Sequence, residues 1–391
     1  MSLIEFGTIM NLTKGKKPKN QFGEYKAGLM PYVDIKAFET GRIESYTDGE
    51  KCLPCKEGDI LIVCDGSRSG LVGKALNGYV GSTLAKISAE GLTQDYLYYF
   101  LQGQYALLNT KKKGTGTPHL NPELLRKQLI YVPSIEVQQR IVFHIEELFS
   151  ELDKGVETLQ TIKEQLAVYR QAVLKEAFDS AEKDCKMLRI EEMLTKDRKG
   201  MSTGPFGTMI KKSDHKTSGV PMLGIENIGA GQFVDGNKIF VTEEKAKELK
   251  SFVLKAGDII ISRSGTVGEI CAVPERADGA LLSTNLMRVS LDANIVRADY
   301  FIALFQSKGV VLDQVKELCK GSTRDFLNQT ILKQIVFPVP SIEKQSEIIA
   351  VIEARFSICD RIEKTVDTAL AQAEAMRQSI LKKAFEGELC K

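Results

Sequence analysis

The 391-residue sequence has no run of about 18 apolar residues, the length that a helix needs to cross a membrane. Its first residues, MSLIEFGTIM, contain no basic segment followed by an apolar one, so the sequence predicts neither a membrane span nor a signal peptide. The eight cysteines are scattered, as is typical of reduced thiols. We therefore expect a cytoplasmic protein, and its length predicts two or more domains.

Catalytic and metal-binding motifs are also lacking. Cys52 and Cys55 form a lone CxxC pair without a second pair or suitably spaced histidines, so no zinc site is predicted. The segment from Gly66 to Lys74 is rich in glycine, but it lacks the first glycine and the final Ser or Thr of a phosphate-binding loop. The sequence shows neither a nucleophile elbow nor the motifs of an adenine methyltransferase. We expect a protein that is not an enzyme and that has no metal and no cofactor.

The sequence does contain a long internal repeat. When Lys113 is aligned with Lys320, the register holds without a gap to Phe178 and Phe385, and about 26 of 66 positions are identical. Upstream the similarity is weaker, but the Gly-Asp-Ile motif that begins at Gly58 returns at residue 257. A repeat of this length predicts two copies of one structural unit, in the order domain, helix, domain, helix.

The two globular parts show a mixed pattern. The short β-branched runs 60–63 and 259–261, each entered through a Gly-Asp turn, predict buried strands, whereas 93–108 and 298–318 predict helices. We therefore predict two α+β domains separated by two long helices. The predicted bounds are 1–130 for the first domain, 131–180 for the first helix, 187–337 for the second domain and 338–391 for the second helix.

Apolar residues in both long helices recur every 3.5 residues over more than four heptads, which indicates a coiled-coil seam. Proline followed by serine, at 133–134 and 340–341, predicts a sharp start for each helix. The predicted seam consists of Ile145, Leu152, Leu159, Ile162 and Leu166 in the first helix and of Ile352, Ile362, Val366, Met376 and Ile380 in the second.

The connection between the first helix and the second domain predicts how the helices run. A link of fewer than ten residues spans at most about 30 Å, so the second domain is expected near the far end of the first helix. The second helix must then run back to bury its apolar stripe. We expect antiparallel helices, with the domains at opposite ends of a rod and an approximate two-fold axis between them.

Basic residues beside glycine and proline suggest loops that contact DNA. The net charge is +4 for residues 1–130 and +3 for 181–337, but −4 for 131–180 and −1 for 338–391. Lysines and arginines in glycine-rich loops can approach phosphates and base edges; for each of them, an ordinary solvated surface charge is the alternative. The candidates are Lys14, Lys16, Lys17, Arg68, Lys112, Lys113, Lys211, Lys212, Arg263, Lys320 and Arg324.

The whole chain resembles the specificity subunits of type I restriction-modification systems. The resemblance rests on the two Gly-Asp-Ile motifs, on GSTRDFLN at 321–328, on PSIEKQ at 340–345 and on RQSILKKAF at 377–385. The first copy departs slightly, with GTGTPHLN at 114–121 and tyrosine at 131 where the second copy has proline, but its register is kept.

The resemblance implies a non-catalytic subunit in which each domain reads one half of a split, asymmetric target in double-stranded DNA. It also implies that the helices set the spacer and bind two methyltransferase (M) subunits, and that restriction (R) subunits join this core. S-adenosylmethionine and ATP would then be bound only by those partner subunits. The alternative is a coiled-coil scaffold that joins two protein-binding domains; a free-standing DNA enzyme fits poorly because its motifs are missing.

Overall fold

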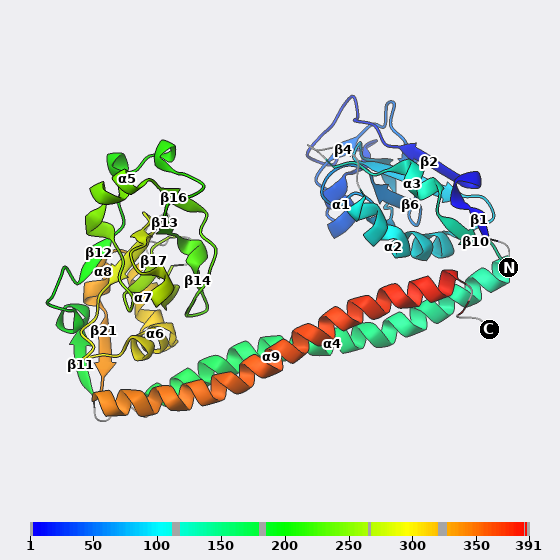
Figure 1. Cartoon of the computed structure of the whole chain (residues 1–391). Helices are drawn as coiled ribbons and strands as arrows, with labels where there is room; N and C mark the ends of the chain where they lie inside the picture. The colour runs from blue at the N-terminus through cyan, green and yellow to red at the C-terminus, as the bar shows by residue number, and fades with distance from the viewer. Residues whose placement is uncertain are drawn as a thin grey trace. The chain divides into compact units, whose positions relative to one another are not determined.

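The computed structural model describes residues 3–111, 118–179, 185–264, 267–319, 327–386 and residue 388 (Figure 1). The chain divides into two compact units. The first unit consists of residues 1–160 and 367–391, and the second consists of residues 161–366. Each unit therefore contains one globular domain together with segments of both long helices. No helix in the described part of the chain is long and apolar enough to cross a membrane.

The first domain contains two four-stranded sheets. The first sheet has the order β2-β9-β6-β7 and is antiparallel, and the second has the order β4-β3-β8-β5 and contains one parallel pair, β3 with β8. Its strands are β1 (Leu3–Glu5), β2 (Met10–Lys14), β3 (Met30–Val33), β4 (Tyr46–Thr47), β5 (Pro54–Cys55), β6 (Ile60–Val63), β7 (Val72–Lys74), β8 (Gly78–Val80), β9 (Leu84–Ala89) and β10 (Leu129–Tyr131). Its helices are α1 (Ile35–Thr40), α2 (Gln94–Thr110) and α3 (Pro122–Arg126).

The second domain repeats this topology. Its four-stranded sheet has the order β12-β20-β17-β18, and a three-stranded sheet, β16-β13-β19, again contains one parallel pair. Its strands are β11 (Lys186–Arg189), β12 (Met201–Thr203), β13 (Val220–Leu223), β14 (Ile228–Gly229), β15 (Gln232–Phe233), β16 (Ile239–Val241), β17 (Ile259–Ser262), β18 (Ile270–Ala272), β19 (Leu281–Leu282), β20 (Leu286–Val289) and β21 (Val336–Val339). Its α-helices are α5 (Glu243–Glu248), α6 (Ala298–Gln306), α7 (Leu312–Cys319) and α8 (Gln329–Gln334).

The predicted strands β6 and β17 lie between two apolar clusters in their domains. All four residues of each strand are buried. Because side chains alternate along a strand, Ile60 and Ile62 enter one cluster, whereas Leu61 enters the other. Ile259 and Ile260 divide between two clusters in the same way. The continuous apolar runs in the sequence therefore reflect strands that are covered on both faces.

The Gly-Asp-Ile motifs are structural. The side chain of Asp59 accepts from the backbone N–H of Lys56 at 2.8 Å and pairs with Lys86 at 2.5 Å. In the second copy, Asp258 accepts from the backbone of Lys255 at 2.8 Å and pairs with Arg198. Each aspartate therefore closes the turn before the buried strand and balances a cation on a neighbouring segment.

The two long helices are α4 (Ile135–Asp179) and α9 (Ile342–Phe385). Within the second unit, Arg170 pairs with Asp360 at 2.6 Å, and Glu176 pairs with Arg355 further along. As the residue number rises along α4, the residue number of the ion-pair partner in α9 falls, so the helices run antiparallel. In the first unit, the N-terminal part of α4 likewise packs with the C-terminal end of α9. Two similar α+β domains with two long antiparallel helices are confirmed.

The structure corrects the predicted helix seam at two positions. Of the predicted residues, Ile145, Ile352 and Val366 are buried, and the following are half-buried: Leu152, Leu159, Ile162, Leu166 and Ile380. Ile362 is 41 % exposed and Met376 is 55 % exposed, so neither lies in the seam. At these two positions the half-buried residue is the next one along the chain, Glu363 or Arg377.

A charged residue occupies these seam positions for a physical reason. Arg377 lies over the ring of Phe149 at 4.3 Å and pairs with Asp153. An arginine can cover an aromatic ring with its planar group while its charge meets a carboxylate. Hydrophobicity alone selects the apolar neighbour Met376 instead, which lies about 100° around the helix from Arg377, so the prediction is wrong at this position and not along the whole seam.

Candidate DNA interface and partner-binding surfaces

Two equivalent loops carry four of the basic residues that were predicted from the sequence, Lys16, Lys17, Lys211 and Lys212. The β2–β3 loop (residues 15–29) and the β12–β13 loop (residues 204–219) leave the same position of the repeated fold. Each begins with a glycine, whose N–H donates to Leu84 O at 2.9 Å in the first copy and to Leu286 O at 3.1 Å in the second. A Cβ atom on either glycine would collide with backbone carbonyl oxygens, so both loop bases require glycine.

The β2–β3 loop combines lysines with aromatic rings. Lys16 and Lys17 are exposed at its start. Further along, Tyr25 is 65 % exposed, and the ammonium of Lys26 lies 5.9 Å from the ring centre of Phe22. Exposed cations next to aromatic surface provide both phosphate contacts and apolar contacts to bases.

The β12–β13 loop has the same character but a different sequence. Lys211 and Lys212 are exposed, and they follow the exposed apolar side chains of Phe206 and Met209. The hydroxyl of Thr284 donates to the backbone oxygen of Pro205 at 2.7 Å and holds the base of the loop. The framework thus repeats between the two domains while the exposed loop residues diverge.

Lys14 lies at the edge of the first loop and is engaged in an ion pair. Its Nζ atom lies 2.8 Å from Oδ2 of Asp65, and Nδ1 of His119 lies 2.7 Å from Oδ1 of the same carboxylate. Partial burial acts to raise the pKa of Asp65, but the bonds from Lys14 and His119 outweigh it and lower that pKa below its ordinary value. The three side chains join β2, the end of β6 and the segment before α3.

Two of the predicted arginines also bond to other residues of this chain. Arg68 pairs with Glu39. Arg263 donates to the backbone oxygens of Leu327 and Thr284, each at 3.3 Å, and burial lowers the pKa of its guanidinium. Both side chains brace the fold, and their contact with DNA stays a prediction. The remaining candidates Lys112, Lys113, Lys320 and Arg324 lie outside the described residues.

The start of each long helix is fixed to its domain by a buried glutamine that the sequence interpretation did not single out. Gln138 is fully buried, accepts from the N–H of Thr93 at 2.8 Å and donates to the oxygens of Gly91 and Pro133 at 2.7 and 3.0 Å. The sequence does contain one signal for it, because the corresponding residue of the second copy, Gln345, is also a glutamine.

Gln345 makes the same three bonds in the second unit. It accepts from the N–H of Arg297 at 2.9 Å and donates to the oxygens of Ile295 and Pro340 at 3.0 and 2.9 Å. A tyrosine adds a fourth bond in each copy: Tyr96 donates to the oxygen of residue 131 at 2.9 Å, and Tyr300 to that of residue 338 at 2.8 Å.

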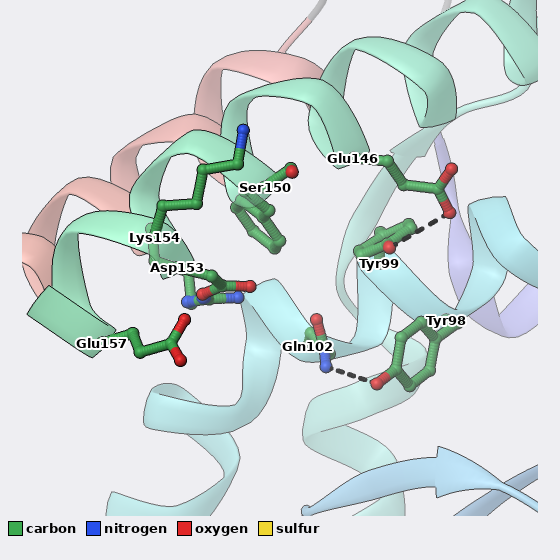
Figure 2. Close-up of a pocket in the computed structure, with 10 residues that line it drawn as sticks. Tyr98, Tyr99, Gln102, Glu146, Ser150, Asp153, Lys154 and Glu157 are labelled. Atoms are coloured by element: carbon green, nitrogen blue, oxygen red, sulfur yellow. Dashed lines mark hydrogen bonds and ion pairs between the residues drawn. The ribbon is translucent and has the colours of Figure 1, made fainter.

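Each unit also has a pocket in the corner between its domain and the helix pair. The first pocket has a volume of about 500 Å³ and lies between Tyr98 to Gln102 of α2 and Glu146 to Glu157 of α4 (Figure 2). Within it, the hydroxyl of Tyr99 donates to Glu146 at 3.3 Å, and burial raises the pKa of that tyrosine.

The corresponding pocket of the second unit has a volume of about 640 Å³. Arg170 there repeats the role of Arg377, since it lies 5.1 Å from the ring centre of Phe356 and 2.6 Å from Asp360. Both corners contain acidic and basic side chains, and each is crossed by an ion pair between α4 and α9. Their shared arrangement fixes the helices to each other beside each domain.

An unpaired apolar surface lies on the opposite side of the helices. In the second unit, it comprises Tyr169, Val351, Ile358 and Ile362, which are 41–50 % exposed. Helical spacing places these residues beside the covered seam, on the flank away from the corner pocket. Exposed apolar side chains of this kind are typical of a surface that binds another protein.

The described residues offer little for metal chemistry. No group of three or more His, Cys, Asp and Glu side chains in the described ranges could hold a metal ion. Cys52 and Cys55 are free thiols, and burial raises the pKa of Cys55 to about 11. A thiol with this pKa is protonated at neutral pH and is a poor nucleophile or ligand.

Comparison with known proteins gives a consistent result. The family model of the type I restriction modification DNA specificity domain matches residues 1–167 and 183–372. The chain is 25 % identical to the EcoBI specificity subunit of Escherichia coli over 413 residues, which cover 99 % of this chain and 85 % of the relative. It is 23 % identical to the MjaVIII specificity subunit of Methanocaldococcus jannaschii, with 88 % and 83 % covered.

A solved structure supports the fold. One chain from a structural study of complex assembly and conformational transition of the type I R-M system matches with a TM-score of 0.69 at 18 % identity. The match covers 99 % of this chain and 98 % of the solved one. At this identity the likeness concerns the fold alone.

Proposed function

The chain belongs to the family of type I restriction-modification DNA specificity subunits, and we propose that its β2–β3 and β12–β13 loops are the segments that read DNA. As a specificity subunit, the protein supplies sequence recognition of a two-part target, with one half for each domain, and no catalysis. The observation that carries the proposal is that a repeated framework presents two equivalent loops whose exposed residues differ. Two loops of different sequence can read two different half-sites.

The exposed lysines of these loops are expected to contact phosphates. A test compares the double variant Lys211→Ala, Lys212→Ala with the charge-matched control Lys175→Ala, Lys186→Ala, which alters α4 and β11. DNA binding by the assembled methyltransferase is measured as a function of salt. The loop variant should weaken binding to all sequences and reduce the salt slope by about 1 for each lost phosphate contact, whereas the control should leave the slope unchanged. An unchanged slope in the loop variant would contradict the proposal.

The apolar surface of Tyr169, Val351, Ile358 and Ile362, which lies in the second unit, is the proposed docking site for one M subunit. The supporting observation is exposed apolar area on helices that already have a buried seam. Because both copies of the repeat supply helix segments, we expect two M subunits for each chain. Native mass spectrometry of the complex tests this stoichiometry, and a single M subunit per chain would refute it.

Further partners and the location are also proposals. R subunits act with specificity subunits and M subunits in type I systems, and we propose that they join this complex. S-adenosylmethionine and ATP would then bind to the partner subunits and not to this chain, and the system would act in the cytoplasm. Calorimetry of the isolated chain with S-adenosylmethionine checks the first point, since measurable binding would contradict it.

A further inference from the structure

We propose that Gln138 and Gln345 are positioning residues that hold each recognition domain at a fixed angle on the helix pair and thereby restrict the spacer length between the half-sites. The inference rests on the proposed function and adds a structural determinant of spacer selectivity. Each glutamine lies in the first turn of a long helix, is fully buried and makes three hydrogen bonds to the backbone.

The three bonds of each glutamine connect different segments. In the first unit, the carbonyl oxygen of Gly91 follows β9, the N–H of Thr93 lies at the start of α2, and the oxygen of Pro133 belongs to the connection from β10 to α4. One side chain on α4 therefore binds both the β9–α2 connection and the β10–α4 connection, and we call this contact between the domain and its helix the joint. A rotation of the domain about this joint would break these bonds and leave buried polar groups without partners, which is costly.

In the second copy, the joint contains the same three hydrogen bonds to backbone groups. The partners of Gln345 are the corresponding backbone groups of Ile295, Arg297 and Pro340. Nearby residues have meanwhile diverged: Tyr131 corresponds to Pro338, and Val137 corresponds to Lys344. The same directional contacts are retained in both joints although their surroundings differ.

The second helix of each unit secures the same joint from another side. The ring of Phe385 at the end of α9 packs edge-on against Tyr96 at 4.9 Å, and Phe178 at the end of α4 packs against Tyr300 at 5.5 Å. These are the tyrosines whose hydroxyls bond to the strand before each helix. Each domain is thus held by both helices, and its orientation follows that of the helix pair.

Stability alone does not explain the choice of glutamine. A buried amide gains little over a well-packed apolar side chain of similar volume, because it loses its hydration on folding. Its directional bonds, however, permit one orientation where a leucine or methionine permits several. An amide at both joints is what a protein needs if the angle of each domain determines its function.

The test measures methyl transfer by the complex of this chain with its M subunit. The DNA substrates carry the half-sites mapped for the wild type, with the native spacer or with one base pair more or less. In Gln138→Leu and in Gln345→Leu, the preference for the native spacer should fall at least tenfold, while substituted bases within each half-site are rejected as by the wild type. Leu61→Ala and Ile260→Ala, which affect buried core residues away from the joints, serve as controls of lowered stability.

An unchanged spacer preference in the glutamine variants, at a melting temperature lowered as in the controls, would overturn the proposal. If the leucine variants do not assemble, Tyr96→Phe and Tyr300→Phe remove a single bond from each joint and should reduce the preference about threefold; no change there would overturn it equally. Failure of the proposed function would appear differently, as a wild-type complex that methylates no two-part motif.

Discussion

The corrected helix seam makes a sharp prediction about two isoleucines of α9. Ile352 and Ile362 have the same side chain on the same helix, but one is buried and the other is exposed. Ile352 is 3 % exposed and belongs to the main apolar cluster of the second unit, whereas Ile362 is 41 % exposed. The hydrophobic pattern of the sequence places both in the seam. Substitution of each isoleucine by aspartate therefore tests the seam seen in the structure against the seam predicted from the hydrophobic pattern.

The magnitudes follow from burial. Ile352→Asp removes a buried side chain whose burial stabilises by about 1.5–3 kcal/mol. It also places a carboxylate in an apolar seam, which adds roughly 1–3 kcal/mol. The expected loss of unfolding free energy is about 2.5–6 kcal/mol. The melting temperature should fall by roughly 5–24 °C, at about 2–4 °C for each kcal/mol. Ile362→Asp changes a largely hydrated position and should cost under about 1 kcal/mol.

Thermal and urea unfolding of the full chain measure this difference, and titration with the M subunit adds a second readout. Ile362→Asp should leave the chain folded but weaken M-subunit binding, since Ile362 belongs to the proposed docking surface. Equal destabilisation by both variants would refute the corrected seam. Undiminished M-subunit binding by Ile362→Asp would refute only the docking surface.

Three further predictions follow from single sites. Gly15→Ala should distort the β2–β3 loop and weaken DNA binding, because its Cβ would meet the backbone of Gly81, whereas Gly23→Ala in the same loop has open space and should be neutral. Because its folded pKa is depressed, Asp65 contributes stability at pH values above its ordinary pKa of 3.8, and this contribution is lost as the pH falls through the folded pKa. Unfolding measured from pH 7 to pH 3 should therefore show the wild type approaching Asp65→Asn at low pH, and a constant difference would contradict this. Cys271, which is fully buried and whose pKa is raised to about 12, should resist alkylation at pH 8 until the second domain unfolds, and rapid labelling of native protein would contradict its placement.

The sequence predicted the architecture well because the strongest patterns are local or repeated. Proline and serine mark the helix starts, and Ser341 indeed accepts from the N–H of Lys344 at 3.4 Å. The strands around Ile60 and Ile259 were recognisable as apolar runs. The short strands β4, β5, β14 and β15 were not, since two residues provide no periodic pattern.

The details of the sites were less accessible. The predicted seam was wrong at Met376 because its neighbour Arg377 packs by its planar face and its charge at once, which a hydrophobic pattern does not register. Gln138 was overlooked because the bonds of a buried amide depend on distant backbone groups. Lys14 was expected in a loop but ends strand β2, and the DNA contacts of Lys14 and Arg68 stay predictions. Their carboxylate partners, Asp65 and Glu39, are brought close only by the fold.

The most direct test of the account exchanges residues 204–219 for the corresponding loop of a relative with a different target and maps the methylated motif in cells. We expect that one half of the motif changes, while the other half and the spacer stay as they were. A change in both halves, or an unaltered motif from an active complex, would contradict the claim that each domain reads its own half-site through this loop.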